Sequence, residues 1–220
     1  MCLMDSFIWN CRGGGNRRTV REAQNLCQKH NPGLVFLCET RQTEERMKSM
    51  CSRLGLKGFA AVGSDGRSGG IALFWHESLL VEVLGKGSRY IDVCVKDGQN
   101  ADPWRATFVY GEPRVENRHL MWELLGQLKN VSPHPWVVTG DFNEAMWQHE
   151  HCSQRARPEG QMREFREALQ SCELTDIGFK GFPYTFDNRQ QGKRNVKVRL
   201  DRACADMEWR NRFQIGRAHV

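Results

Sequence analysis

The 220-residue sequence lacks several features that would each decide its class. No apolar run approaches the roughly 20 residues of a membrane-spanning helix, and the opening MCLMDSFIWN has neither the length nor the basic start of a secretory signal. The nine cysteines include no C-x-x-C pair, which argues against a zinc knuckle or a disulfide framework. There is no low-complexity segment, linker or internal repeat. We therefore expect one intracellular domain, in the nucleus or cytoplasm, with no membrane partner and with reduced, mostly buried thiols.

One further motif is missing, and the overall charge is mildly basic. The chain has no G-x-x-x-x-G-K-[ST] loop, so nucleoside triphosphate hydrolysis of that type is not indicated. The net charge is +6 and the pI is near 8.9, which is compatible with a polyanionic partner but does not require one.

Short apolar runs alternate with stretches of helical period, the pattern of an α/β layer fold. Apolar runs predict strands at residues 6–10, 33–40 and 136–143. Five runs between residues 59 and 111, separated by Gly, Ser and Asp turns, predict an antiparallel meander. Shorter strands are expected near the end of the chain, in LTDIG, YTFDN and VKVRLDRA.

Four helices are expected between these strands. We expect Thr19 to cap the first helix, Thr43 to cap the second and Gly55 to close the second. The third, around residues 116–128, should bury one leucine stripe: Leu120, Leu124, Leu125 and Leu128. The fourth should bury Met162, Phe165, Leu169 and Cys172. Between them, QHEHCSQRARPEG contains three potential metal ligands, but no second pair has zinc-finger spacing, so a solvated loop is the better interpretation.

Polar side chains stand where the strands stop: Asn10, Glu39, Tyr110, Asp141 with Asn143, and Asp201. Each alone has an ordinary explanation as a turn residue, a surface charge, a core ring or an ion-pair partner. Together they favour a site, because ligands of open α/β sheets bind at the carboxyl ends of strands. Carboxylate and amide oxygens suit Mg²⁺, and a second acid can activate water while an amide and a phenol contact phosphoryl oxygens. The set therefore predicts metal-assisted phosphoryl hydrolysis.

The segment NRQQGKRNVKVRLDR concentrates basic residues around a glycine-centred turn: Arg189, Lys193, Arg194, Lys197, Arg199 and Arg202. On composition alone a solvated hairpin is the simpler interpretation. Its position between Thr185 and Asp201 makes contact with a DNA backbone at least as good a hypothesis.

Eight motifs, in order, resemble the endonuclease domain of plant non-LTR retrotransposons: WNCRG, VFLCET, GRSGGIALFW, FVYGEP, WVVTGDFNE, RPEGQMREFREAL, YTFDN and RLDRA. That domain belongs to the endonuclease/exonuclease/phosphatase superfamily, whose DNase I-like fold is shared with apurinic endonucleases. The resemblance covers residues 3–213. It implies an α/β fold in which two mixed β-sheets form a sandwich flanked by helices.

The resemblance also implies roles for the strand-end residues. Glu39 is expected to be the main ligand of Mg²⁺, or of Mn²⁺ in its place, with Asn10 beside it. Tyr110 and Asn143 are expected to contact the phosphate. Asp141 is expected to align or activate the attacking water.

Two further residues match active-site positions of the family. They are Thr185 and Asp201, the latter supporting the terminal histidine. The sequence departs from the pattern at Gly14, where leucine is common, and at Phe186 and Asp187, where tryptophan and serine are common; an acid beside a DNA groove should weaken phosphate binding. The candidate DNA contacts are Arg189, Lys193, Arg194 and Lys197.

The implied function is a Mg²⁺-dependent DNA endonuclease that acts as a monomer and precedes a reverse transcriptase in an intact element. Two alternatives stay open: a phosphatase of the same fold, and a non-enzymatic remnant. The family's closing Ser-Asp-His motif is absent, and IGRAHV resembles the translation of a sequencing-library adapter. We therefore expect residues 1–214 to be a C-terminally truncated endonuclease domain that lacks its last strand, residues 215–220 to be a non-native tail, and the chain as written to be inactive.

Overall fold

The computed structural model describes residues 6–64, 68–213 and 218–219, which divide into two compact units, Met1–Phe108 and Val109–Val220. The strands that begin in the first unit are β1 (Ser6–Asn10), β2 (Leu34–Cys38), β3 (Gly58–Val62), β4 (Ile71–Trp75), β5 (Leu79–Gly87), β6 (Tyr90–Asp97) and β7 (Trp104–Tyr110). Its helices are α1 (Arg17–His30) and α2 (Glu44–Arg53). Strand β7 runs across the boundary, so its last two residues belong to the second unit.

The described residues of the second unit form three α-helices and several short strands. Its strands are β8 (Trp136–Asp141), β9 (His151–Cys152), β10 (Thr175–Asp176), β11 (Phe179–Lys180), β12 (Phe186–Asp187), β13 (Lys197–Val198), β14 (Asp201–Ala205) and β15 (Ala218–His219). Its helices are α3 (Arg118–Lys129), α4 (Glu159–Ser171) and α5 (Met207–Phe213).

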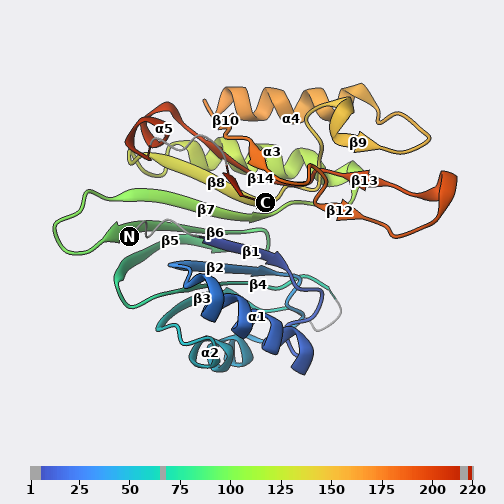
Figure 1. The fold of residues 1–220 in the computed structure, drawn as a ribbon. Helices are drawn as coiled ribbons and strands as arrows, with labels where there is room; N and C mark the ends of the chain where they lie inside the picture. The colour runs from blue at the N-terminus through green and yellow to red at the C-terminus, as the bar shows by residue number, and fades with distance from the viewer. Residues whose placement is uncertain (1–5, 65–67, 214–217, 220) are drawn as a thin grey trace. The chain divides into compact units, whose positions relative to one another are not determined.

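Most of the strands form two large mixed sheets flanked by helices, which confirms the expected fold class (Figure 1). The strand orders are β1-β2-β4-β3 and β10-β14-β8-β7-β6-β5. The prediction of one meander between residues 59 and 111 is wrong, because β3 and β4 belong to the first sheet and β5, β6 and β7 to the second. Strand β4 already pairs with β2 on one edge and β3 on the other, so no edge is left for β5.

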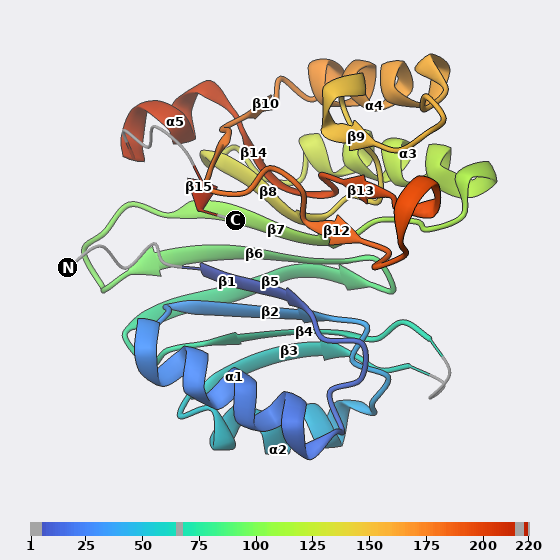
Figure 2. The same ribbon diagram turned by 45° about the vertical axis from the view of Figure 1, so that its right-hand side comes forward.

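The apolar run of β2 is continuous because both of its faces are covered. Val35 and Leu37 pack in a cluster with residues of α1 and α2, which lie together on one face of the four-stranded sheet (Figure 2). Phe36 points to the opposite face, where its ring lies 5.3 Å from that of Phe108, centroid to centroid. A strand buried on both faces loses the usual alternation of apolar and polar residues.

The ends of the first two helices test the predicted caps. Helix α1 begins before Thr19, because the side chain of Asn16 accepts a hydrogen bond from the N–H of Arg18 at 2.9 Å; the prediction of Thr19 as the cap is wrong. Thr19 is instead buried within the helix. The cap at Thr43 is confirmed, and Gly55 follows α2 with a φ of 74°, a conformation that suits glycine.

The helices of the second unit pack through aromatic rings. Phe165 of α4 stacks on Trp122 of α3, with ring centroids 4.6 Å apart, and lies 5.2 Å from Phe142. The predicted buried face of α4 is confirmed. The predicted leucine stripe of α3 is wrong in part: Leu120 is 54% exposed, because the buried stripe runs through Met121, Leu125 and Leu128.

Three smaller expectations concern the second unit and the chain end. The predicted solvated loop after β8 contains a 3-10 helix, η2 (Gln148–Glu150), and strand β9, which pairs with β13. The predicted strand VKVRLDRA is divided into β13 and β14. Within IGRAHV, Ala218 and His219 form β15 and pair in parallel with β11; residues 215–217 and 220 lie outside the described residues.

Eight of the nine cysteines lie in the described part of the chain, where all eight are free and seven are buried, so the expectation of reduced, buried thiols is confirmed there. Burial raises the pKa of the Cys11 thiol to about 11. Across residues 6–64, 68–213 and 218–219, no helix has the length and apolar character needed to cross a bilayer.

Candidate active site

The first unit brings Asn10 and Glu39 together. Strands β1 and β2 are parallel, with Asn10 opposite Cys38, so their carboxyl ends reach the same edge of the sheet. There the Nδ2 group of Asn10 donates a hydrogen bond to Oε1 of Glu39 at 3.2 Å. Asn10 and Glu39 are therefore neighbours, as the sequence predicted.

The backbone at Glu39 is held in an uncommon conformation. Its φ is 53°, in the left-handed region, which costs a non-glycine residue about 1–3 kcal/mol unless its surroundings enforce it. Two loops enforce it here. The carbonyl of Glu39 accepts from the N–H of Gly13 at 2.8 Å, and the next N–H, of Thr40, donates to the carbonyl of Gly70 at 3.0 Å. The Glu39 side chain also lies 3.5 Å from a guanidinium nitrogen of Arg41.

The oxygens at this edge fit a hard divalent cation. Oδ1 of Asn10 is buried and has no hydrogen-bond partner among the described residues, although buried polar atoms normally have one. The Glu39 carboxylate beside it is 20% exposed. Mg²⁺ takes one or two protein carboxylates and keeps several waters, so it does not need a larger cage. Among the described residues, no group of three His, Cys, Asp or Glu side chains that could hold a metal is present.

The second unit brings Asp141 and Asp201 together. Strands β8 and β14 are antiparallel, and Asp141, the last residue of β8, lies opposite Asp201. Asp201 is therefore the first residue of its strand, and the prediction that it ends a strand is wrong. Because β14 is antiparallel to β8, Asp201 nevertheless lies beside the end of β8, where Asp141 stands. Oγ1 of Thr185 accepts hydrogen bonds from the N–H groups of Leu200 and Asp201 at 2.9 and 3.0 Å, and burial raises the pKa of Asp201.

Tight backbone contacts join the end of β7 to Asp141. The N–H of Gly111 donates to the carbonyl of Asp141 at 2.6 Å, and Nδ2 of Asn143 donates to the carbonyl of Gly111 at 2.8 Å. The N–H of Asn143 donates to Oδ1 of Asp141 at 2.8 Å. A Cβ at Gly111 would lie 2.4 Å from the carbonyl oxygen of Phe142, so only glycine fits there. Tyr110, which precedes it, is only 5% exposed.

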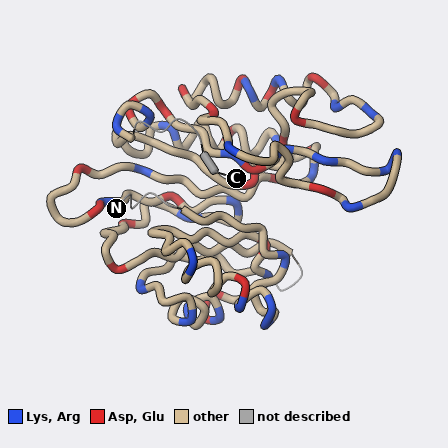
Figure 3. The backbone as a smooth tube through the Cα atoms, in the orientation of Figure 1, with Lys and Arg blue, Asp and Glu red and all other residues tan. Residues whose placement is uncertain are grey.

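The basic hairpin, residues 186–198, joins β12 to β13 through a short 3-10 turn, η3 (Gly192–Arg194). Figure 3 shows Lys and Arg residues along it. Arg189, Lys193 and Arg194 are exposed, while Lys197 is partly buried and pairs with Asp187 at 3.8 Å. The carboxylate of Asp187 accepts the N–H of Arg189 at 2.7 Å, and this bond leads the contacts that lower the pKa of Asp187. This acid is therefore part of the hairpin's own hydrogen bonding.

Arg199 and Arg202 do not belong to that basic surface, which corrects the expectation from the sequence. They are only 4% and 3% exposed and form a buried network with Glu150 and Asp176. Arg202 contacts Oε2 of Glu150 and Oδ2 of Asp176, both at 2.8 Å, and Arg199 contacts Oε1 of Glu150 at 2.9 Å. Burial acts to raise the pKa of Glu150 and of Asp176, but hydrogen bonds and charge from the two arginines outweigh it and lower both pKa values.

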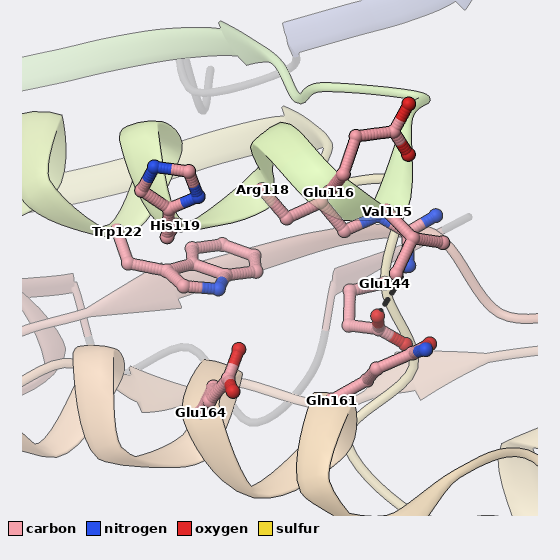
Figure 4. A pocket seen from close by; sticks show the side chains of 8 residues that line it. All are labelled: Val115, Glu116, Arg118, His119, Trp122, Glu144, Gln161 and Glu164. Carbon is pink, nitrogen blue, oxygen red and sulfur yellow. Dashed lines mark hydrogen bonds and ion pairs between the residues drawn. The ribbon is translucent and has the colours of Figure 1, made fainter.

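A second buried carboxylate, Glu144, lies three residues after Asp141. It is fully buried and accepts hydrogen bonds from Arg118, at 2.5 Å, and from Arg157. It lines a hollow of about 280 Å³ between α3 and α4, together with Trp122 and other residues of those helices (Figure 4). The carboxylate is already paired, so its role in the geometry is to join α3 to the segment after β8.

Sequence reasoning missed the acidic members of these networks. Glu144 carried a signal, since it extends the polar run after an apolar strand. Glu150 and Asp176 carried none, because the arginines that pair with them are at least 23 positions away in the chain.

Comparisons with known proteins connect this geometry to a family. The profile of the Endonuclease/Exonuclease/phosphatase family matches residues 8–210. The chain belongs to that family. The family generally depends on divalent metal ions, and its members are phosphodiesterases, nucleases and phosphatases. No curated protein matches the sequence at a significant level.

Solved structures show the same fold at low sequence identity. The AP endonuclease LMAP from Leishmania major aligns with a TM-score of 0.69 at 17% identity, over 92% of this chain and 78% of that one. The endonuclease domain of TRAS1, a telomere-specific non-LTR retrotransposon, aligns at 0.66 and 14%, over 92% and 85%. The 3′ phosphatase NExo from Neisseria, bound to a product DNA hairpin, aligns at 0.66 and 16%, over 93% and 87%.

Proposed function

We propose that this member of the family is a Mg²⁺-dependent DNA endonuclease domain that nicks one strand of its target and derives from a retrotransposon protein. The observation that carries the proposal is the pair of oxygen ligands at the ends of β1 and β2. Asn10 keeps a buried oxygen without a partner in the described chain, and the carboxylate of Glu39 lies beside it. Such an arrangement is costly unless a cation completes it.

The roles follow from the chemistry of each side chain. Glu39 and Asn10 would hold Mg²⁺ or Mn²⁺, which supplies charge neutralisation at the phosphate when bound. Asp141 aligns the attacking water and accepts its proton. Its orientation is set by the N–H of Asn143 on Oδ1. The second amide N–H of Asn143 and the hydroxyl of Tyr110 donate to phosphoryl oxygens, where such donors stabilise developing charge.

Thr185 and Asp201 position the end of strand β8, where Asp141 lies. The Thr185 hydroxyl fixes the backbone at Asp201, the residue opposite Asp141 in the sheet. Rigid strands place catalytic groups more accurately than loops do, which explains why both acids are held in β-structure.

The basic hairpin favours DNA over a small phosphoester. Its exposed arginine and lysine residues can neutralise backbone phosphates, the main source of affinity for duplex DNA. The similarity to the TRAS1 endonuclease domain supports an origin in a non-LTR element, in which a reverse transcriptase would be the partner. A phosphatase remains the second candidate, because NExo is described as a 3′ phosphatase.

The test is nicking of supercoiled plasmid by the purified 220-residue chain, with Mg²⁺ and with EDTA. Asp141→Asn should lower the rate by about 10²–10⁴, the range for losing a positioned acid or base. Asp97→Asn, an exposed acid at the end of β6, is the matched control and should leave the rate unchanged.

Phosphate release from inositol phosphates, measured alongside, separates the hypotheses. Release without nicking would favour the phosphatase. Turnover of neither substrate would refute the endonuclease and favour a non-enzymatic remnant. Mg²⁺-dependent nicking above the Asp141 variant would support the proposal and contradict the expectation that the chain is inactive.

A further inference from the structure

Phe182 is exposed in the segment between β11 and β12. Its side chain is among the most exposed of the large apolar residues, at 62%. Burying a phenylalanine is favourable, yet single exposed apolar residues are common on protein surfaces. Exposure alone therefore does not indicate a binding site. The residues around the ring do.

The ring is held in place while it is exposed. Gly181 before it has a φ of 99°, a backbone conformation that suits glycine. Pro183 after it disfavours helical backbone at Phe182. Tyr184 packs edge-on against the ring, with centroids 5.5 Å apart and planes at 75°. Phe182 is therefore presented to solvent in a defined orientation instead of folding onto the surface.

One cation of the basic hairpin lies beside this ring. Nζ of Lys197 lies 5.8 Å from the ring centroid of Phe182, and Lys197 belongs to the basic hairpin, whose Lys193 and Arg194 are exposed. An apolar protein surface would have to desolvate these cations, at a cost. A nucleic acid strand matches both features, because its bases stack on aromatic rings while its phosphates pair with the cations.

An adjoining hollow provides room for an unstacked base. It has a volume of about 640 Å³, and its walls include Trp147, Phe179, Lys180 and Gly181. Trp147 is 47% exposed. Arg199 also lines it and keeps one buried N–H, on Nε, without an acceptor among the described residues.

We propose that Phe182 stacks on an unpaired base of the bound DNA, with Lys197 at a neighbouring phosphate. The surface beside the basic hairpin then prefers DNA that is locally unpaired, such as a single-stranded tail next to a duplex, over a closed duplex. The inference rests on the proposed function and deepens it by naming the class of DNA.

Binding in EDTA tests this without turnover. The full chain is titrated against a labelled DNA hairpin with a blunt end, and against the same hairpin with a single-stranded tail that carries 2-aminopurine. Phe182→Ala should weaken binding of the tailed DNA by about 5- to 150-fold, the effect of losing one stacked base. It should change binding of the blunt hairpin less than twofold. Phe182→Trp should restore the affinity.

Leu120→Ala, which shortens another exposed apolar side chain of the same unit, is the control and should change neither affinity. Stacking also quenches 2-aminopurine, so its emission should fall on binding the wild type and stay high with Phe182→Ala. Unchanged circular dichroism shows that a variant is folded.

Equal losses on both DNAs, no loss on the tailed DNA, or no binding of either DNA by the wild type would each overturn the proposal. Failure of the endonuclease proposal is seen separately, as absence of plasmid nicking with Mg²⁺. The experiments can therefore refute base stacking without refuting the endonuclease proposal, and can refute the endonuclease proposal without refuting base stacking.

Discussion

Replacing Arg202 with methionine should lower the free energy of unfolding of this protein by about 3–5 kcal/mol at pH 7, the cost of breaking a buried ion pair from one side. Methionine keeps much of the apolar stem and removes the guanidinium. The size of the effect follows from what Arg202 contacts. Its two Nη atoms bind both oxygens of Glu150, at 3.2 and 2.8 Å, and one binds Asp176 at 2.8 Å.

The variant would leave two buried carboxylates with one arginine. The side chains of Glu150 and Asp176 are only 5% and 15% exposed, so water cannot replace the missing donors well. Arg199 still reaches both acids but neutralises one charge. Since whole domains are stable by about 5–15 kcal/mol, the loss should be plain in a urea titration followed by tryptophan fluorescence.

The pH dependence gives an independent check on the cause. The pKa values of Glu150 and Asp176 are lowered in the folded state, so their contribution to stability is present above the unfolded pKa values, near pH 4. It is lost as the pH falls through the lower, folded values. The difference in unfolding free energy between wild type and Arg202→Met should therefore shrink as the pH is lowered from 7 toward 4 and below.

Two further variants separate charge from packing. Adding Glu150→Gln to Arg202→Met removes one charge of each sign and should cost clearly less than the sum of the two single changes. Arg189→Ala, at an exposed arginine of the basic hairpin, should change stability by less than about 0.5 kcal/mol. A loss below 1 kcal/mol for Arg202→Met, or strict additivity in the double variant, would refute the buried network as a source of stability.

Three other predictions concern the candidate site. Glu39→Gln should weaken Mg²⁺ binding in calorimetry and abolish nicking, whereas Glu173→Gln, at a side chain 79% exposed, should change neither; equal Mg²⁺ binding by both would remove Glu39 from the metal site. Replacing Lys193 and Arg194 with alanine should flatten the slope of log affinity against log salt by about 0.9 for each phosphate that the variant no longer neutralises, and an unchanged slope would show that these side chains do not bind phosphate. Burial raises the pKa of Asp201 in the folded state, so the stability that this side chain contributes falls as the pH rises from its unfolded pKa to its folded pKa. Urea titrations should therefore show Asp201→Asn gaining stability relative to wild type between pH 3 and pH 7. A constant difference in unfolding free energy would contradict this.

Much of the candidate site could be predicted because strand ends are visible in the sequence. The run before Glu39 is apolar at every position, so its end is sharp, and the parallel neighbour β1 ends at Asn10. The same holds for β8, which is buried throughout and stops at Asp141. Thr185 was less readable, since its hydroxyl supports Asp201 through backbone groups 15 and 16 positions away.

The sequence alone determined most of the segments that form strands and helices, because burial and backbone periodicity act over a few neighbouring residues; it did not indicate α5 or β9. It did not determine which strands share a sheet. The sequence of β4 has the same apolar pattern as the strands that follow it, and only the structure shows that its two edges pair with β2 and β3. The sequence also could not show which basic residues of one segment are exposed and which are buried. Lys193 and Arg194 reach solvent, whereas Arg199 and Arg202 are buried beside Glu150 and Asp176. The free energy of a charge depends on what surrounds it in space, and only the tertiary structure brings these distant partners together.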